Sequence, residues 1–368
     1  MAAVAVAAGG VLAAGVLAPA AVGASGRPDP VRQGLSALVE SGGAPGALAS
    51  VRGRDGQQRA YTAGVGDVAS GAKVPRDGRV RVGSNTKAFT AVVMLQLVGE
   101  GKVRLDGFVD DYLPGLVRGE GIDGSRITVR QLLQHTSGLP NYTKYLSDEI
   151  RPYTPRELLD LALQHKADAE PGEKWAYSNT NYLLAGLIIE KVSRHSLAGE
   201  IDRRVIKRLG LRHTYFPAPG DVTVRGPHPK GYYQEKPGAP WVDATEWDPS
   251  WAWAAGQLVS TNSDLNRFFG ALISGDLLEE EQLDEMRTTV PAGYPFPAGA
   301  RYGLGLVSTP LSCGGVYWGH GGSMTGYETR GGVTESGRAV NVAVTTQPGQ
   351  AVKDDMDALI DGVLCSRR

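Results

Sequence analysis

The sequence predicts an α/β protein of the α+β sandwich type, in which an antiparallel sheet flanked by helices carries a large all-helical insertion. Two observations predict this class. Strand-like runs with turn residues lie near both ends of the chain, over 47–65 and 302–344, whereas the region between them has the apolar spacing of helices. We therefore expect one domain, residues 25–368, made of an α/β part and a helical part: 25–83 with 300–368, and 84–299.

The first 24 residues are almost wholly Ala, Val, Gly and Leu, and small residues precede Ser25. This composition is typical of a secretory signal peptide, although no Lys or Arg precedes the apolar run. A membrane anchor is disfavoured because the run is short and weakly apolar, and no later stretch is long enough to span a bilayer. We expect a secreted monomer without stable membrane insertion.

The 368-residue chain has 38 basic and 39 acidic residues, evenly mixed, so its formal net charge is −1. Without a basic block and interleaved aromatic residues, nucleic acid is not expected as a partner. No residues have metal-ligand spacing, so neither a metal nor another cofactor is expected. The two cysteines, Cys313 and Cys365, fit one disulfide in an oxidising compartment, with two buried free thiols as the alternative.

Individual elements follow from local patterns. Residues 30–41 have the spacing of an amphipathic helix, and two strand-like runs around Asp55-Gly56 predict a β-hairpin. An apolar run over 88–98, free of Pro and Gly, predicts a buried helix whose first turn carries Ser84. Further helices are expected at four places, the first two with a threonine cap: 128–133, 154–163, 181–192 and 263–272.

The loop over 219–250 is rich in Pro, Gly and aromatic residues, which predicts a long surface loop over a cleft. After this loop, the spacing of apolar residues changes from that of helices to that of strands. Strand patterns and a final helical pattern are expected here: 302–306, 316–320, 327–330, 339–344 and 351–363. A turn at 335–337 separates the last two strands.

Ser84 and Lys87 form a Ser-x-x-Lys pattern at the start of the buried helix. Residues three apart share a helix face, so the lysine lies beside the serine hydroxyl. A serine becomes a nucleophile when a base takes its proton, and a buried lysine with a lowered pKa can be that base. Chance also supplies this pattern: Ser70 and Lys73 form a second copy, but no helix follows it, so we expect no function there.

Two further patches carry groups suited to catalysis. Tyr177 can carry a proton and Asn179 can bind an amide, although a turn before an apolar helix is also where cap residues gather. His320 leaves a strand beside Gly321 and Gly322, and these glycines let another backbone approach closely. The other five histidines are expected to be structural.

In order along the chain, the Ser-x-x-Lys, Tyr-x-Asn and His-x-Gly patterns closely resemble the three motifs of the serine penicillin-recognising family. This family includes penicillin-binding proteins, class C β-lactamases and DD-peptidases. Within it, the sequence looks most like the secreted D-alanyl-D-alanine carboxypeptidases of actinomycetes, which pair cysteines at the positions of Cys313 and Cys365. The resemblance implies a β-lactamase/DD-peptidase-like fold. It extends over five landmark stretches, two of which contain the first two motifs: 82–87, 127–133, 135–139, 177–181 and 302–306.

The resemblance also implies a role for each residue. Ser84 would attack a carbonyl and form an acyl-enzyme, while Lys87 and Tyr177 would manage its proton, with either as the base. His320 would lie across the cleft as an electrostatic and proton-relay partner. The substrate-binding positions implied are the N–H groups of Ser84 and Ser323 as the oxyanion hole, Gly322 beside them, Asn179 for the substrate amide, and Trp251 on the pocket wall.

Two departures from those carboxypeptidases concern the substrate. They hold its terminal carboxylate with a threonine after the histidine and an arginine on the strand before the first cysteine, where this chain has Gly321 and Val307. A carboxylate without such partners binds poorly. We expect an exported serine hydrolase acting on a small peptide, ester or β-lactam, with a carboxypeptidase-like activity on D-Ala-terminated peptides. The alternatives are an esterase, a D-amino-acid amidase or peptidase, an acyl transferase, a β-lactamase and a non-catalytic β-lactam sensor, with Val307, Gly321 and the loop over 219–250 deciding among substrates.

Overall fold

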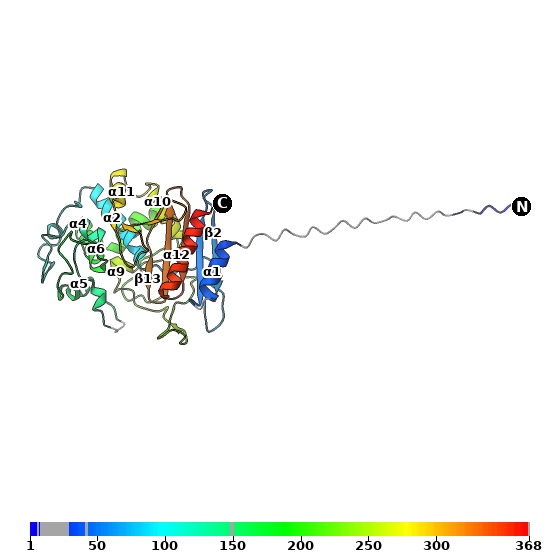
Figure 1. Ribbon diagram of the computed structural model, residues 1–368, viewed down its shortest axis with the longest axis horizontal. Helices are drawn as coiled ribbons and strands as arrows, with labels where there is room; N and C mark the ends of the chain where they lie inside the picture. Colours follow the sequence, from blue (N-terminus) through cyan, green and yellow to red (C-terminus); the bar gives the residue numbers. More distant parts are fainter. Residues whose placement is uncertain (6, 8–28, 41–42, 148–150, 367–368) are drawn as a thin grey trace.

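The computed structural model describes residues 1–5, 7, 29–40, 43–147 and 151–366. In this part of the chain, strands from both ends of the sequence form one nine-stranded antiparallel sheet, and the helical region lies beside it (Figure 1). The predicted fold class is therefore confirmed. Most of the predicted signal peptide lies outside the described residues.

The sheet has the strand order β2-β1-β15-β14-β12-β11-β10-β9, and β13 pairs with β14 beside that path. Its centre joins the two chain ends, because β1 pairs with β15 over six residue pairs. The strands are β1 (Gly46–Arg52), β2 (Gln58–Gly64), β9 (Val290–Pro291), β10 (Arg301–Tyr302), β11 (Val307–Pro310), β12 (Val316–Gly319), β13 (Gly322–Met324), β14 (Tyr327–Thr334) and β15 (Ala339–Val344).

Helices cover both faces of the sheet. On one face α1 (Pro30–Glu40) and α12 (Gln350–Cys365) lie side by side (Figure 1), and on the other lies α10 (Asn262–Ile273). Side chains of β1 alternate between these faces: Ala47 and Ala49 pack toward α1 and α12, and Leu48 packs in the larger core shared with the helical part. The predicted disulfide joins Cys313, after β11, to Cys365 at the end of α12.

The helical part contains the expected capped helices. The hydroxyl of Thr128 accepts a hydrogen bond from Gln131 N, and that of Thr154 accepts one from Glu157 N, so both predicted caps are confirmed. The helices of this part are α2 (Thr86–Gly99), α3 (Val109–Tyr112), α4 (Val129–Gln134), α5 (Pro155–Leu163), α6 (Asn179–Ser193), α7 (Leu197–Ile201), α8 (Lys207–Leu209), α9 (Trp253–Gly256) and α11 (Glu280–Arg287).

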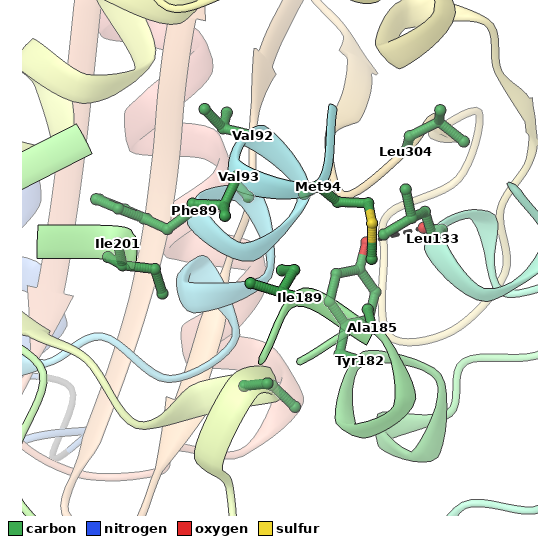
Figure 2. Close-up of a cluster of buried hydrophobic side chains, with 14 of the residues drawn as sticks. Phe89, Val92, Val93, Met94, Leu133, Tyr182, Ala185, Ile189, Ile201 and Leu304 are labelled. Carbon is green, nitrogen blue, oxygen red and sulfur yellow. Dashed lines mark hydrogen bonds between the residues drawn. The ribbon is translucent and has the colours of Figure 1, made fainter. Parts of the chain in front are cut away.

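Helix α2 is the centre of the larger core. Figure 2 shows its apolar side chains among those of neighbouring elements, and the ring of Phe89 stacks on that of Phe268 with 3.7 Å between centroids. Tyr182 of α6 lies nearby and donates its hydroxyl hydrogen to the carbonyl oxygen of Leu133, at 2.8 Å. Because α2 is buried over nearly its whole length, the residues at its start are held in place.

One predicted strand is wrong, the run over 302–306. Strand β10 ends at Tyr302, the chain turns through Gly303 and Gly305, and β11 begins at Val307. Gly305 has a φ of +77°, which favours glycine, and a Cβ there would lie only 2.6 Å from the Cβ of Ala91 on α2. The alternating pattern was therefore a tight turn packed against the central helix.

The range 84–299, predicted to be all helical, also contributes to the sheet region. Strand β9 pairs with β10, and α10 packs on the sheet. The sequence did not reveal these contacts, because apolar spacing does not show which segments lie near the sheet. The loop over 219–250 carries the two-residue strands β6 (Tyr232–Tyr233) and β7 (Val242–Asp243). No helix of the described residues is long and apolar enough to cross a membrane.

Candidate active site

Ser84 lies in a single 3₁₀ turn, Gly83–Asn85, that leads from the short strand β3 (Val80–Arg81) into α2. It lines a cavity of about 390 Å³. Strand β13 runs against this turn so closely that a Cβ on Gly322 would lie 2.0 Å from Val82 O and 2.7 Å from Ser84 N. Only glycine permits this approach, which agrees with the expected close backbone contact at the His-x-Gly pattern.

Lys87 is fully buried one helical turn after Ser84. Its Nζ lies 3.0 Å from Ser84 Oγ, 2.7 Å from Asn179 Oδ1 and 2.8 Å from the carbonyl oxygen of Ala255. Burial holds the pKa of Lys87 well below its usual range. The neutral amine can donate two N–H bonds to Asn179 and Ala255, which leaves its lone pair to accept the hydroxyl proton of Ser84.

Tyr177 precedes α6 and lines the same cavity. Its ring centroid lies 4.8 Å from Lys87 Nζ. Burial raises the pKa of Tyr177 above its usual value, against the opposing effect of a hydrogen bond with Ser84. Tyr177 therefore keeps its proton at neutral pH, whereas Lys87 readily loses its own.

Ser323 faces Ser84 across the contact between β13 and the 3₁₀ turn. A two-residue turn joins β13 to β14, so Met324 and Tyr327 form the first hydrogen-bonded pair, and the next pair, Ser323 with Glu328, is not hydrogen-bonded. The N–H of Ser323 consequently points away from β14, toward Ser84. Two backbone N–H groups, from Ser84 and Ser323, thus lie at one end of the cavity.

His320 is buried at the end of β12, with both ring nitrogens occupied. Its Nε2 lies 3.1 Å from the hydroxyl of Tyr302, and its Nδ1 lies 2.5 Å from the carbonyl oxygen of Gly321. Burial, with a smaller contribution from Lys87, lowers the pKa of His320 to about 3. His320 is therefore uncharged at neutral pH. No sequence pattern marks Tyr302 as its partner, because a tyrosine at a strand end is common in any core.

The structure brings the other predicted residues to the same cavity. Asn179 and Trp251 line it, as do Val307 and Gly321 at the two positions of departure. Residues 219–250 do not, so the expected loop over the cleft is wrong: this segment packs elsewhere, for example through Tyr232 N, which donates to Thr345 O. Its many Pro and Gly residues mark irregular structure but not the face that it covers.

His135 lies beneath the site, fully buried, with its ring centroid 4.4 Å from that of Tyr177. Its Nδ1 accepts a hydrogen bond from Ser178 N at 3.3 Å and lies 2.9 Å from Asn181 Nδ2. These contacts fix the turn that carries Tyr177 and Asn179. The histidine therefore has a structural role, as expected for histidines outside the His-x-Gly pattern.

The sequence model of the family described as Beta-lactamase matches residues 31–364. This chain belongs to the beta-lactamase family. The match covers both the sheet and the helical part, so the whole described domain is of the β-lactamase/DD-peptidase type, a fold shared by serine hydrolases that recognise penicillin.

Two solved structures resemble this beta-lactamase family member over nearly their full length. A D-stereospecific amidohydrolase from Streptomyces sp. is 38% identical with a TM-score of 0.82, covering 92% of this chain and 99% of that one. A D-amino acid amidase from Ochrobactrum anthropi SV3 is 27% identical with a TM-score of 0.81, at the same coverage. Among curated proteins, Protein flp of Staphylococcus aureus is 29% identical over 215 residues, and the match spans 41% of its length.

No group of three or more His, Cys, Asp or Glu side chains in the described ranges could hold a metal ion. The cavity instead brings together a serine, a buried lysine, a tyrosine and two backbone N–H groups. These are the groups needed for nucleophilic attack on a carbonyl carbon and for stabilising the oxyanion that results. The protein is a serine hydrolase of this superfamily.

Proposed function

We propose that the protein hydrolyses amide bonds of D-amino-acid amides and short D-peptides through an acyl-enzyme on Ser84. The observation that carries the proposal is the match over 99% of the length of two structures, named as a D-stereospecific amidohydrolase and a D-amino acid amidase. The disulfide between Cys313 and Cys365 supports export, because such bonds persist in oxidising compartments.

Lys87 acts as the base in the first step. It takes the Ser84 proton as Oγ bonds to the amide carbon, and the N–H groups of Ser84 and Ser323 stabilise the oxyanion, each such donor being worth roughly 100- to 1000-fold in rate. When the carbon–nitrogen bond breaks, the proton passes to the leaving amine, with Tyr177 as the carrier. Water then attacks the ester, gives its proton to the same base, and releases the acid and Ser84.

Asn179 and Trp251 bind the substrate. Asn179 Oδ1 is occupied by Lys87, so its Nδ2 is the group left for the acyl part of the substrate. Trp251 is half-buried on the cavity wall and supplies an apolar surface. In this scheme His320 is a neutral residue held in position by its hydrogen bond with Tyr302. This role differs from the electrostatic role that the motif resemblance implies.

The carboxypeptidase alternative has weaker support at the positions expected to hold a terminal carboxylate. Val307 and Gly321 line the cavity but offer neither a cation nor a hydroxyl. Amide substrates without a carboxylate avoid this difficulty, and so do esters. One observation favours this alternative: two cationic side chains, Arg330 and Lys353, line the same cavity.

The test compares the D- and L-enantiomers of an amino-acid amide, with phenylalanine amide as a first choice, and follows Ser84 by intact mass. We expect turnover of the D-amide, a transient acyl adduct with a thioester substrate, and a fall of about 10⁴-fold or more in kcat for Ser84→Ala. The matched control is Ser70→Ala, the other copy of the pattern, which should leave turnover unchanged. Equal rates on the two enantiomers, or an adduct away from Ser84, would contradict the proposal.

A further inference from the structure

The cavity that contains Ser84 continues along the sheet toward α12, where its lining becomes charged. Glu328 and Arg330 come from β14, and Lys353 and Asp357 from the first two turns of α12. Ser323 connects this end to the catalytic centre: its hydroxyl donates to Glu328, while its backbone N–H faces Ser84. None of the four charged residues has a part in the steps described above.

The carboxylate oxygens at this end all have partners. Both oxygens of Asp357 accept from Arg330 Nη1, at 3.2 and 3.1 Å. One oxygen of Glu328 accepts from the Ser323 hydroxyl, and the other lies 3.4 Å from Arg330 Nη2. The acidic groups are therefore satisfied within the protein.

The cationic donors are incompletely satisfied. Among the described residues, the ion pair of Lys353 is to Glu328 Oε2 at 3.8 Å, beyond hydrogen-bond distance, although its side chain is only 17% exposed. Arg330 Nε is buried without a hydrogen-bond partner in the same set of residues. Ammonium and guanidinium groups are donors only, so a group that Lys353 binds from the cavity must be an acceptor, and a carboxylate forms the strongest such hydrogen bond.

We propose that Lys353, supported by Arg330, forms a subsite for a carboxylate of the substrate. This inference rests on the proposed function and narrows its substrate class, because it favours D-peptides that carry a free carboxylate over neutral D-amides. Val307 on β11 stands where the resembling carboxypeptidases have an arginine. In this chain, cationic side chains of α12 and β14 would bind the carboxylate instead. Such a carboxylate can come from the leaving amino acid or from the acyl side chain, since the described groups recognise only the anion.

The experiment uses two pairs of substrates that differ only in the carboxylate. One pair is N-acetyl-D-alanyl-D-alanine and its C-terminal amide, which tests the leaving group. The other pair is the α-amide of D-glutamate and that of D-glutamine, which tests the acyl side chain. For each pair, the ratio of kcat/KM for the acid to that for the neutral substrate is measured in the wild type and in Lys353→Met.

We expect this ratio to fall about 10- to 100-fold in Lys353→Met for one of the two pairs, the range for losing a hydrogen-bonded partner of a charged group. The pair affected identifies the source of the carboxylate. Lys353→Arg should keep most of the ratio, because it retains the charge. Lys191→Met, which removes an exposed lysine from the end of α6, is the matched control.

A ratio unchanged in both pairs would overturn the subsite. This includes the case in which kcat/KM falls equally for the acid and the neutral substrate, since an equal fall indicates a structural role for Lys353. If the Met variant does not fold, salt gives the same answer in the wild type: KM for the acid should rise with ionic strength while KM for its neutral partner does not. Absence of turnover of every neutral D-amide contradicts the proposed function itself. Turnover of the neutral amides with no effect of charge contradicts only the carboxylate subsite.

Discussion

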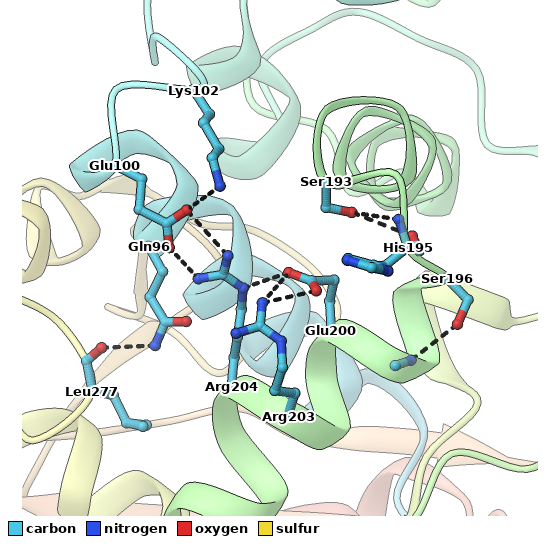
Figure 3. Close-up of polar contacts among 11 residues, drawn as sticks. Gln96, Glu100, Lys102, Ser193, His195, Ser196, Glu200, Arg203, Arg204 and Leu277 are labelled. Atoms are coloured by element: carbon cyan, nitrogen blue, oxygen red, sulfur yellow. Dashed lines mark hydrogen bonds and ion pairs between the residues drawn. The ribbon is translucent and has the colours of Figure 1, made fainter.

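Ionisable side chains lie at both ends of helix α2, but the two ends differ in how charge is balanced. At the start of the helix, Lys87 lies among neutral oxygens, and no ion pair of the described residues includes it. At its end, Glu100 pairs with Arg204, which also pairs with the buried Glu200. Figure 3 shows this second cluster, in which Lys102 and Arg203 complete the pairing.

The pKa values at both ends are lowered, but for opposite reasons: the surroundings of Lys87 disfavour its charged form, whereas those of Glu100 and Glu200 favour theirs. Burial alone lowers the pKa of Lys87, so its proton is weakly held. In the cluster, the hydrogen bond from Arg204 lowers the pKa of Glu100 to about 2, and although burial raises that of Glu200, bonds from Arg204 and Arg203 bring it below its usual value. Paired charges resist titration and stabilise a structure, whereas an unpaired buried amine is available as a base.

The strongest test of this contrast adds a carboxylate to the catalytic end. Asn179→Asp places an acid where Oδ1 now lies 2.7 Å from Lys87 Nζ. A nearby opposite charge favours the protonated amine and raises the pKa of Lys87 by roughly 1–3 units. We expect kcat/KM at neutral pH to fall about 100-fold or more, and the acid limb of the pH profile to move to higher pH.

Asn179→Ala is the matched control for this change. It removes the same oxygen without adding charge, so it should slow turnover while leaving the acid limb at or below its wild-type position. If the Asp and Ala variants have the same pH profile, Lys87 is not the group whose deprotonation limits the rate.

The second test removes charge from the other end of α2. Glu200→Gln leaves Arg204, whose side chain is only 9% exposed, without its buried partner. Breaking a buried pair of this kind costs about 3 kcal/mol or more. We expect a lower denaturation midpoint at neutral pH, with kcat/KM of the folded protein unchanged, measured by urea unfolding and by amide hydrolysis.

The pH dependence of this loss has a definite sign. Because the pKa of Glu200 is lowered in the folded state, its stabilising effect is present above the pKa of the unfolded carboxyl and is lost as the pH falls. The difference between the wild type and Glu200→Gln should therefore shrink in acid. Glu120→Gln, at an exposed position, is the control, and a similar loss of stability there would contradict the argument.

How much of the candidate site could be predicted from the sequence depends on how far apart in the chain the contacting residues lie. Ser84 and Lys87 are three residues apart on one helix, so their contact follows from local spacing. Tyr177 and His320 come from distant segments and were found only through the order of three motifs. Lys353 could not be found in this way, because its meeting with Arg330 depends on how α12 packs on β14, which no local pattern reports.

The same limit explains the errors in the fold. The run over 302–306 has strand-like alternation, but two glycines allow a turn that fits against α2, and packing decides between the two. The loop over 219–250 was correctly expected to be irregular, yet composition does not fix which face a loop covers. Periodicity reports what each segment can form, and long-range contacts select among the options.

The smallest expected effect comes from His320, which lies in the cavity but is not a charge carrier. Because burial lowers the pKa of His320 to about 3, His320 is uncharged at neutral pH, where we propose that Lys87 acts as the base. His320→Gln should therefore reduce kcat/KM by about tenfold, the cost of one weakened hydrogen bond with Tyr302 at 3.1 Å, without moving the acid limb. Tyr302→Phe removes the same hydrogen bond from the other side and should behave alike. A shift of the acid limb in either variant would show that His320 carries the titrating proton, and the contrast between the two ends of α2 would then no longer explain the pH dependence of catalysis.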